Sequence, residues 1–87
     1  MKTVNQKQWE HFTDYWSRKA WEELTNANTL LDLMVNRFER TVIIVNKRTG
    51  KTSIARCHPN DEFCVGVGVA IAFAKWHGVQ IPKVERM

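Results

Sequence analysis

The run Thr41–Val45 constrains the fold of this chain more than any other segment. All five of its residues are β-branched, a composition that favours extended backbone. A polar turn follows, in which Gly50 can supply the positive φ that a hairpin loop requires. The more polar run from Lys51 to Cys57 then returns along the first. The sequence therefore predicts an antiparallel β-hairpin over residues 41–57.

The first of these two strands is apolar on both faces. Val42 and Ile44 point to one side and Ile43 and Val45 to the other, so the strand is either central in a sheet or covered on both faces. The polar return strand is expected nearer an edge. Because an isolated hairpin is marginally stable in water, helices must cover it.

Two helices are expected before the hairpin. Residues 5–25 carry an apolar stripe at helical spacing, from which Tyr15 and Trp21 deviate; its members are Trp9, Phe12, Trp16, Ala20 and Leu24. This helix should stop near Thr25–Asn28. A second helix is predicted from Asn28 to Arg40, with Asn28 as its N-cap and Arg37 and Arg40 in its last turn. Its apolar residues are Leu30, Leu31, Met34, Val35 and Phe38.

The segment from Val65 to His77 fits two structures. Its strict alternation of Val, Ile and Phe with Gly and Ala has the period of a strand. Gly and Ala are depleted in strands, however, and Gly78 stands where a helix C-terminus would need it. We expect a helix over residues 64–77, with the strand as the alternative. Pro82 is expected to end ordered structure, leaving residues 79–87 as a loose tail.

These elements predict a single α+β domain over residues 1–87. Two N-terminal helices occupy residues 5–40. The hairpin occupies residues 41–57, and a Gly/Ala-rich helix occupies residues 64–77. No apolar segment follows Met1, so no secretory leader is expected, and the longest uncharged run, residues 63–74, is too short to cross a bilayer. With two cysteines, the chain is expected to be cytoplasmic with reduced thiols and to have no membrane partner.

Catalytic and metal-binding patterns are weak. Cys57, His58 and Cys64 lack the paired spacing of a zinc site, and neighbouring side chains on a strand point apart, which separates Cys57 from His58. Asp61 and Glu62 are expected to form a polar turn in which Asp61 or Asn60 accepts backbone hydrogen bonds. Gly66 and Gly68 lack the third glycine of a dinucleotide fingerprint. We therefore expect no enzyme, no metal and no cofactor.

Two binding functions remain. The chain has four Trp and one Tyr among 87 residues, more than one small core is expected to bury, and Tyr15 and Trp21 are the candidate partner contacts. The net charge of +4 allows a second function, nucleic-acid binding at the hairpin tip. Its candidate residues are Lys47, Arg48 and Lys51, with Arg37, Arg40 and Arg56 expected nearby.

Residues 41–78 resemble a family of small uncharacterised proteins encoded by bacteriophages and prophages. The resemblance rests on the β-branched strand, Gly50, Cys57 and Asp61, and on the stretch Gly68-Val69-Ala70-Ile71-Ala72-Phe73-Ala74-Lys75. It implies a phage origin and the helical form of the last segment. The expected function is a non-catalytic accessory protein that binds a host protein in the bacterial cytoplasm. One such function is inhibition of a defence nuclease in the manner of an anti-CRISPR protein, and self-association is also allowed.

Overall fold

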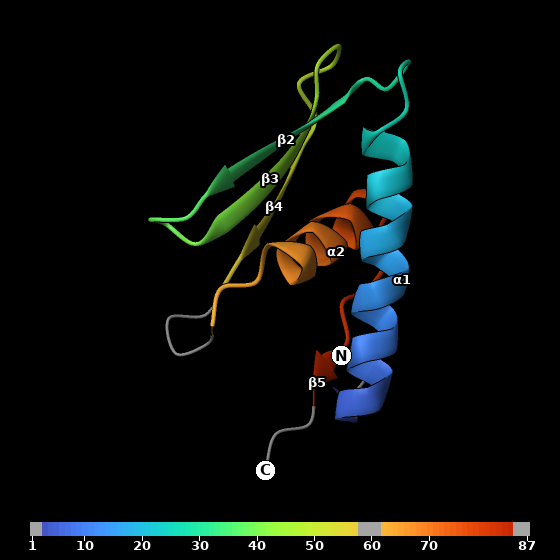
Figure 1. Cartoon of the computed structure of the whole chain (residues 1–87), viewed down its shortest axis with the longest axis vertical. Coiled ribbons are helices and arrows are strands. Elements are labelled where there is room, and N and C mark those ends of the chain that lie inside the picture. The colour runs from blue at the N-terminus through green and yellow to red at the C-terminus, as the bar shows by residue number, and fades with distance from the viewer. Residues whose placement is uncertain (1–2, 58–61, 85–87) are drawn as a thin grey trace.

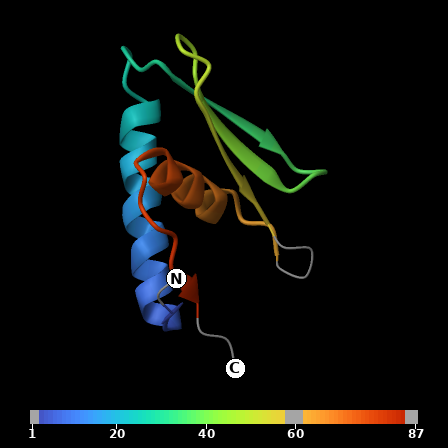
Figure 2. The ribbon, with the colours of Figure 1, turned by 180° about the vertical axis from the view of Figure 1, so that it is seen from behind.

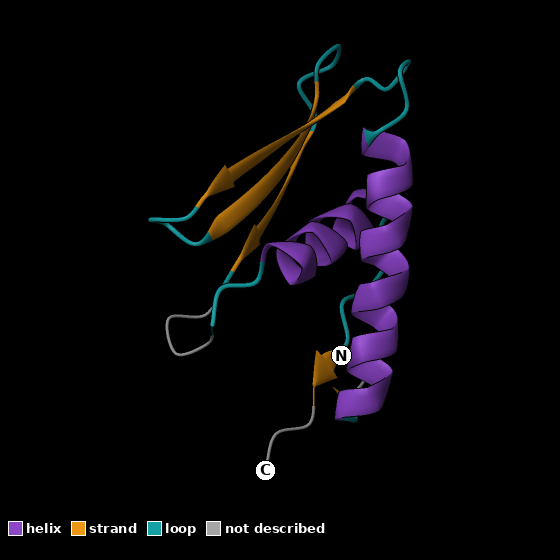
Figure 3. Cartoon of the chain, in the orientation of Figure 1, coloured by secondary structure: helices purple, strands orange, loops and turns teal. Residues whose placement is uncertain are grey.

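The computed structural model describes residues 3–57 and 62–84, which form a small α+β domain (Figures 1 and 3). The elements along the chain are β1 (Thr3–Val4), α1 (Gln6–Leu24), β2 (Leu31–Asn36), β3 (Thr41–Asn46), β4 (Thr52–Arg56), α2 (Val65–Trp76) and β5 (Lys83–Val84). The α+β class is confirmed, although the described elements include two helices rather than three.

Strands β2, β3 and β4 form an antiparallel sheet in that order, so β3 is central and β4 lies at an edge, as predicted. Gly50, with a φ of 77°, provides the left-handed residue of the turn between β3 and β4. The hairpin is therefore two strands of a three-stranded sheet.

The predicted second helix at 28–40 is wrong. Residues 31–36 form strand β2, and residues 37–40 form a tight turn into β3. Asn28 caps no helix, and Arg37 and Arg40 lie in the turn, where Arg40 has a φ of 58°. The cause is long-range, because β3 presents an unpaired backbone edge that β2 satisfies along its whole length.

Helix α1 begins and ends close to its predicted bounds. Asn5 is its N-cap: the Asn5 side chain accepts a hydrogen bond from the Gln8 N–H, and the Gln8 side chain accepts one from the Asn5 N–H. This reciprocal capping box satisfies two amides of the first turn. The C-cap is Thr25. The predicted stripe faces inward, with Ala20 fully buried and the other four members half-buried or better.

Helix α2 confirms the helical interpretation of the Gly/Ala-rich segment and explains its composition. It packs against β3 and β4 on one side and against α1 on the other, so its surface is apolar nearly all round (Figure 1). Small residues allow both neighbours to approach closely. A Cβ on Gly68 would lie 2.5 Å from Val42 Cγ2, whereas Gly66 faces α1 near Ser17. Gly78, with a φ of 73°, follows the C-terminus of the helix.

The core lies between α2 and one face of the sheet. Val42, Ile44, Ser53 and Ala55 are buried there, while the alternate residues Ile43 and Ile54 point to the other face. The hydroxyl of Ser53 donates a 2.6 Å hydrogen bond to the backbone oxygen of Ala72, which attaches the sheet to α2.

The last part of the chain is not entirely loose. Residues 83–84 form β5, which pairs in parallel with β1 through Thr3–Lys83 and Val4–Val84 (Figure 2). The expectation that order ends at Pro82 is therefore wrong for these two residues. Residues 85–87 of the predicted tail lie outside the described residues, as does the predicted turn at 58–61.

Candidate protein-binding surface

The face of the sheet that points away from α2 carries a row of apolar side chains. Its register places Met34 beside Ile43 and Ile43 beside Ile54, one residue from each strand. Met34 is 49% exposed and Ile54 42% exposed, and Ile43 is half-buried between them. Val45 extends the row along β3. We call this surface, made of Met34, Ile43, Val45 and Ile54, the open face.

The turn between β2 and β3 adds a fully exposed aromatic ring. Phe38 is 97% exposed, although it was predicted on the apolar side of a helix. The Asn36 side chain accepts a 2.9 Å hydrogen bond from the Glu39 N–H, which stabilises the turn that contains Phe38. Burying this ring against a partner would remove a large apolar area from water.

Polar residues border the open face. Arg56 follows Ile54 at the next outward position of β4, and Asp32 precedes Met34 on β2. An apolar centre with a charged rim is the composition found at protein–protein interfaces. The exposed row is continuous across three strands, which distinguishes it from the scattered apolar residues of an ordinary surface.

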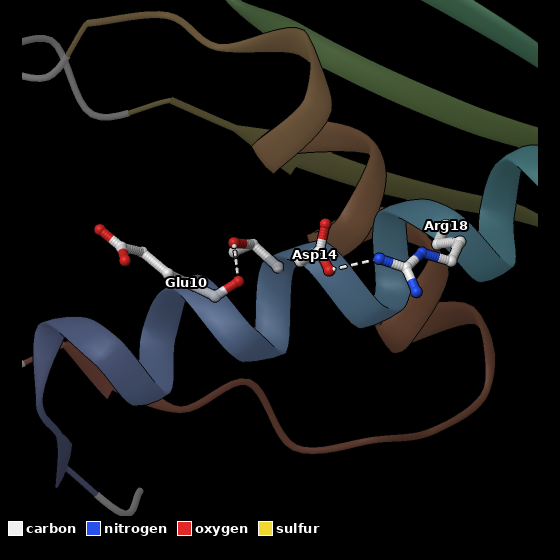
Figure 4. A network of polar contacts seen from close by, with 4 residues as sticks. Glu10, Asp14 and Arg18 are labelled. Carbon is white, nitrogen blue, oxygen red and sulfur yellow. Dashed lines mark hydrogen bonds and ion pairs between the residues drawn. The ribbon is translucent and has the colours of Figure 1, made fainter.

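The aromatic candidates Tyr15 and Trp21 are exposed as expected, at 47% and 42%, but they do not form one patch. Six residues apart on α1, they lie about 120° apart around the helix axis. Arg18 and Asp14 form an ion pair that is 2.8 Å long and well exposed (Figure 4). At 100° per residue, both fall in the arc between Tyr15 and Trp21. The Tyr15 ring also packs edge-on against Trp16.

The six basic candidates divide into two groups at opposite ends of β3. Arg37 and Arg40 lie in the turn before it, next to Arg56, and the other three lie at the turn after it. The length of the strand, about 17–20 Å, separates the groups. The expectation that all six lie near the hairpin tip is therefore wrong.

Within the tip itself, Lys51 lies with its Nζ 4.7 Å from the centroid of the Trp76 ring, a cation–π contact. Lys47 and Arg48 are exposed.

The described residues contain no group of three His, Cys, Asp or Glu side chains that could hold a metal ion. Cys57 Sγ lies 3.6 Å from the backbone oxygen of Glu62, and Cys64 is exposed. His58 of the metal-binding pattern and Asp61 of the predicted polar turn lie outside the described residues.

A cavity of about 380 Å³ opens where the C-termini of both helices meet the start of β2. Its apolar lining includes Leu31, Phe73 and Trp76, and exposed polar side chains form much of the rest, among them Glu23, Asn28 and His77. These groups define no particular ligand chemistry. Among the described residues, no helix is long and apolar enough to cross a membrane.

Comparison of the chain with protein-family models, with curated proteins and with solved structures found no match. The assignment of a site therefore rests on geometry. Met34 and Phe38 were predicted on a helix, and the open face was missed. The period-two recurrence of Leu31, Leu33 and Val35 is a signal for strand β2, but apolar Met34 interrupts the alternation and nothing local marks it as part of an exposed row.

Proposed function

We propose that this protein is a non-catalytic binding domain that attaches to another protein through the open face. The observation that carries the proposal is the cross-strand row Met34–Ile43–Ile54, with its two outer members close to half exposed. A small domain gains from burying such a row, and a folded partner surface is the natural cover.

The chemistry of the partner follows from the border of the face. Arg56 lies beside Ile54 and Asp32 beside Met34, so the complementary surface is apolar at its centre, with an acidic group opposite Arg56 and a basic group opposite Asp32. The narrower form of this proposal is the one expected from the phage-like segment: an inhibitor in the bacterial cytoplasm that binds a host defence protein such as a CRISPR nuclease.

The test is a pull-down of tagged protein from nuclease-treated bacterial lysate, followed by mass spectrometry. The wild-type protein should retain a stoichiometric partner, and Ile54→Glu should lose it while remaining folded. The control is Gln80→Glu, which adds the same charge at an exposed position after α2. Equal retention by both variants would contradict binding through the open face.

The same experiment includes the earlier aromatic candidates. Tyr15→Ala and Trp21→Ala alter exposed rings on α1 and leave the sheet unchanged. If these two variants lose the partner and Ile54→Glu keeps it, the contact lies on α1 instead.

A second candidate function is nucleic-acid binding at the hairpin tip, supported by the exposure of Lys47 and Arg48. Reversal of both charges should then abolish binding of a duplex, and the affinity of the wild-type protein should fall steeply with salt. A parallel pull-down from untreated lysate separates the two functions, because partners that are retained there and lost after nuclease treatment would favour nucleic-acid binding over the open face.

A further inference from the structure

The free edge of β2 presents backbone groups in a known pattern. The N–H of Lys47 donates a 2.7 Å hydrogen bond to the oxygen of Leu30, so even-numbered residues of β2 face β3. The backbone groups of Leu31, Leu33 and Val35 therefore point outward, along an edge that no described strand pairs. Such an edge is a template for pairing with another strand.

The other edge of the sheet is protected differently. On β4 the backbone oxygen of Ile54 points outward, and it accepts a 3.1 Å hydrogen bond from Lys75 Nζ of α2. On β2 the caps are local: Thr29 Oγ1 accepts the Leu31 N–H at 3.1 Å, and Asp32 Oδ1 accepts the Leu33 N–H at 3.0 Å. Rotation of two exposed or half-buried side chains is enough to free these amides.

We propose that β2 pairs antiparallel with β2 of a second copy of this chain, about a two-fold axis through Met34. Two three-stranded sheets then join into one six-stranded sheet. Only the odd-numbered residues of β2 have outward N–H and C=O groups, so an odd-numbered residue of one copy must lie opposite an odd-numbered residue of the other. The two-fold axis therefore passes through a residue of β2 and not through the midpoint between two neighbouring residues.

The side chains select Met34 among these axes. An axis there places Met34 opposite Met34, Leu33 opposite Val35, and Asp32 opposite Asn36. Beyond the strand end, it brings Phe38 of the turn toward Leu30, which is 46% exposed. An axis through Leu33 would instead place Met34 against Asp32, and one through Val35 would place Met34 against Asn36. An axis through Asp32 would place two like charges directly opposite each other. Of these four axes, only the one through Met34 matches apolar with apolar and polar with polar without opposing like charges.

The polar pair is also chemically matched. The Asn36 oxygen is occupied by the Glu39 N–H, which leaves its amide NH₂ to donate to Asp32 of the second copy. Asp32 thus exchanges the Leu33 N–H for a side-chain donor, and the Leu33 N–H gains the oxygen of Val35. Both groups released from the contact between Asp32 and the Leu33 N–H therefore find a replacement.

The open face remains exposed in the dimer. The row Ile54–Ile43–Met34 continues across the axis into the same row of the second copy, so the apolar surface doubles in length. One strand pair is small beside the ~1,200–2,000 Å² of a standard interface, so dimers should appear at micromolar concentrations or above.

The first test is sedimentation velocity over about a hundredfold range of concentration, where mass action should convert monomer to dimer. Val35→Pro removes an outward N–H without removing a hydrogen bond to β3, and it should remain monomeric throughout. Ile54→Glu changes the same sheet away from the axis and should dimerise like the wild type. A wild-type protein that stays monomeric, or a Val35→Pro variant that dimerises, would overturn the proposal.

A second test covers the case in which Val35→Pro fails to fold. In a Cys57→Ala, Cys64→Ala background, Met34→Cys places two thiols across a pair whose Cα atoms lie about 4.5 Å apart, within disulfide reach. Mild oxidation should cross-link this variant several-fold faster than Ile54→Cys, which is similarly exposed. Equal rates would refute the Met34 axis.

These outcomes are separable from the proposed function. Loss of the lysate partner in Ile54→Glu tests the open face, and loss of dimer in Val35→Pro tests the edge. A monomeric wild-type protein whose partner is lost only in Val35→Pro would reject the second copy and assign the edge to a strand of that partner.

Discussion

Gly68 lies directly against Val42, so close that a Cβ on the glycine would sit 2.5 Å from Val42 Cγ2 and 3.2 Å from its Cβ. This contact sets the distance between α2 and the central strand. It also makes the two glycines of the helix unequal, because a Cβ on Gly66 would meet its nearest atom, Ser17 Oγ, at 3.9 Å.

Gly68→Ala should therefore destabilise the protein by about 1–3 kcal/mol, since the helix and β3 must move apart. Gly66→Ala should stabilise it by up to about 1 kcal/mol, because alanine loses less conformational entropy in a helix. Urea denaturation measures both free energies of unfolding. A similar loss of stability in both variants would contradict the close contact between Gly68 and Val42.

Ser53→Ala should lower the free energy of unfolding by about 1 kcal/mol, because it removes the buried hydrogen bond to the Ala72 oxygen. The matched control is Thr52→Ala, whose exposed hydroxyl contacts Gly50, and its effect should stay within about 0.5 kcal/mol. A thermal melt monitored by circular dichroism compares them. A larger loss in the control would mean that the sheet is attached to α2 by other contacts.

Truncation of two phenylalanines should change stability by very different amounts. Phe73 is 5% exposed and packs against Trp16, so Phe73→Ala should destabilise the fold by about 3–5 kcal/mol. Phe38 is 97% exposed, and Phe38→Ala should change stability by less than about 0.5 kcal/mol. Chemical denaturation distinguishes them, and a strongly destabilised Phe38→Ala would show that this ring is covered in solution.

The capping box of α1 gives a fourth prediction. Asn5→Ala removes the acceptor for the Gln8 N–H and should lower stability by about 1 kcal/mol. Lys7→Ala, an exposed change in the same turn, should have an effect within about 0.5 kcal/mol. Amide hydrogen exchange of Gln8 should accelerate in the first variant and not in the second.

The elements predictable from sequence were those specified by local chemistry. Helix α1 has a regular stripe and a polar stop at Thr25, and β3 is wholly β-branched apart from its final Asn46. Helix α2 was predicted over the alternative strand, because Gly78 and the alanines favour a helix. Strand β2 was missed, because its apolar spacing also suits a helix and pairing with β3 decides between them.

Local patterns also specify only part of the candidate site. Exposure of Tyr15 and Trp21 was predictable, because it depends on the stripe of one helix. The row Met34–Ile43–Ile54 was not, because three separate segments form it and its exposure depends on both helices packing elsewhere. The division of the basic residues between two turns likewise follows from the sheet, which no local pattern specifies.

The parallel pair of β1 and β5 has a practical consequence for handling the molecule. Thr3 and Val4 lie beside Lys83 and Val84, near the end of α1 that is remote from the sheet (Figure 1). A tag or surface attachment introduced before Thr3 or after Val84 would therefore leave the sheet unobstructed. A short linker could also join the ends, because closing a short loop between neighbouring points carries little entropy. A circular permutant opened at the turn between β3 and β4 should then retain the fold.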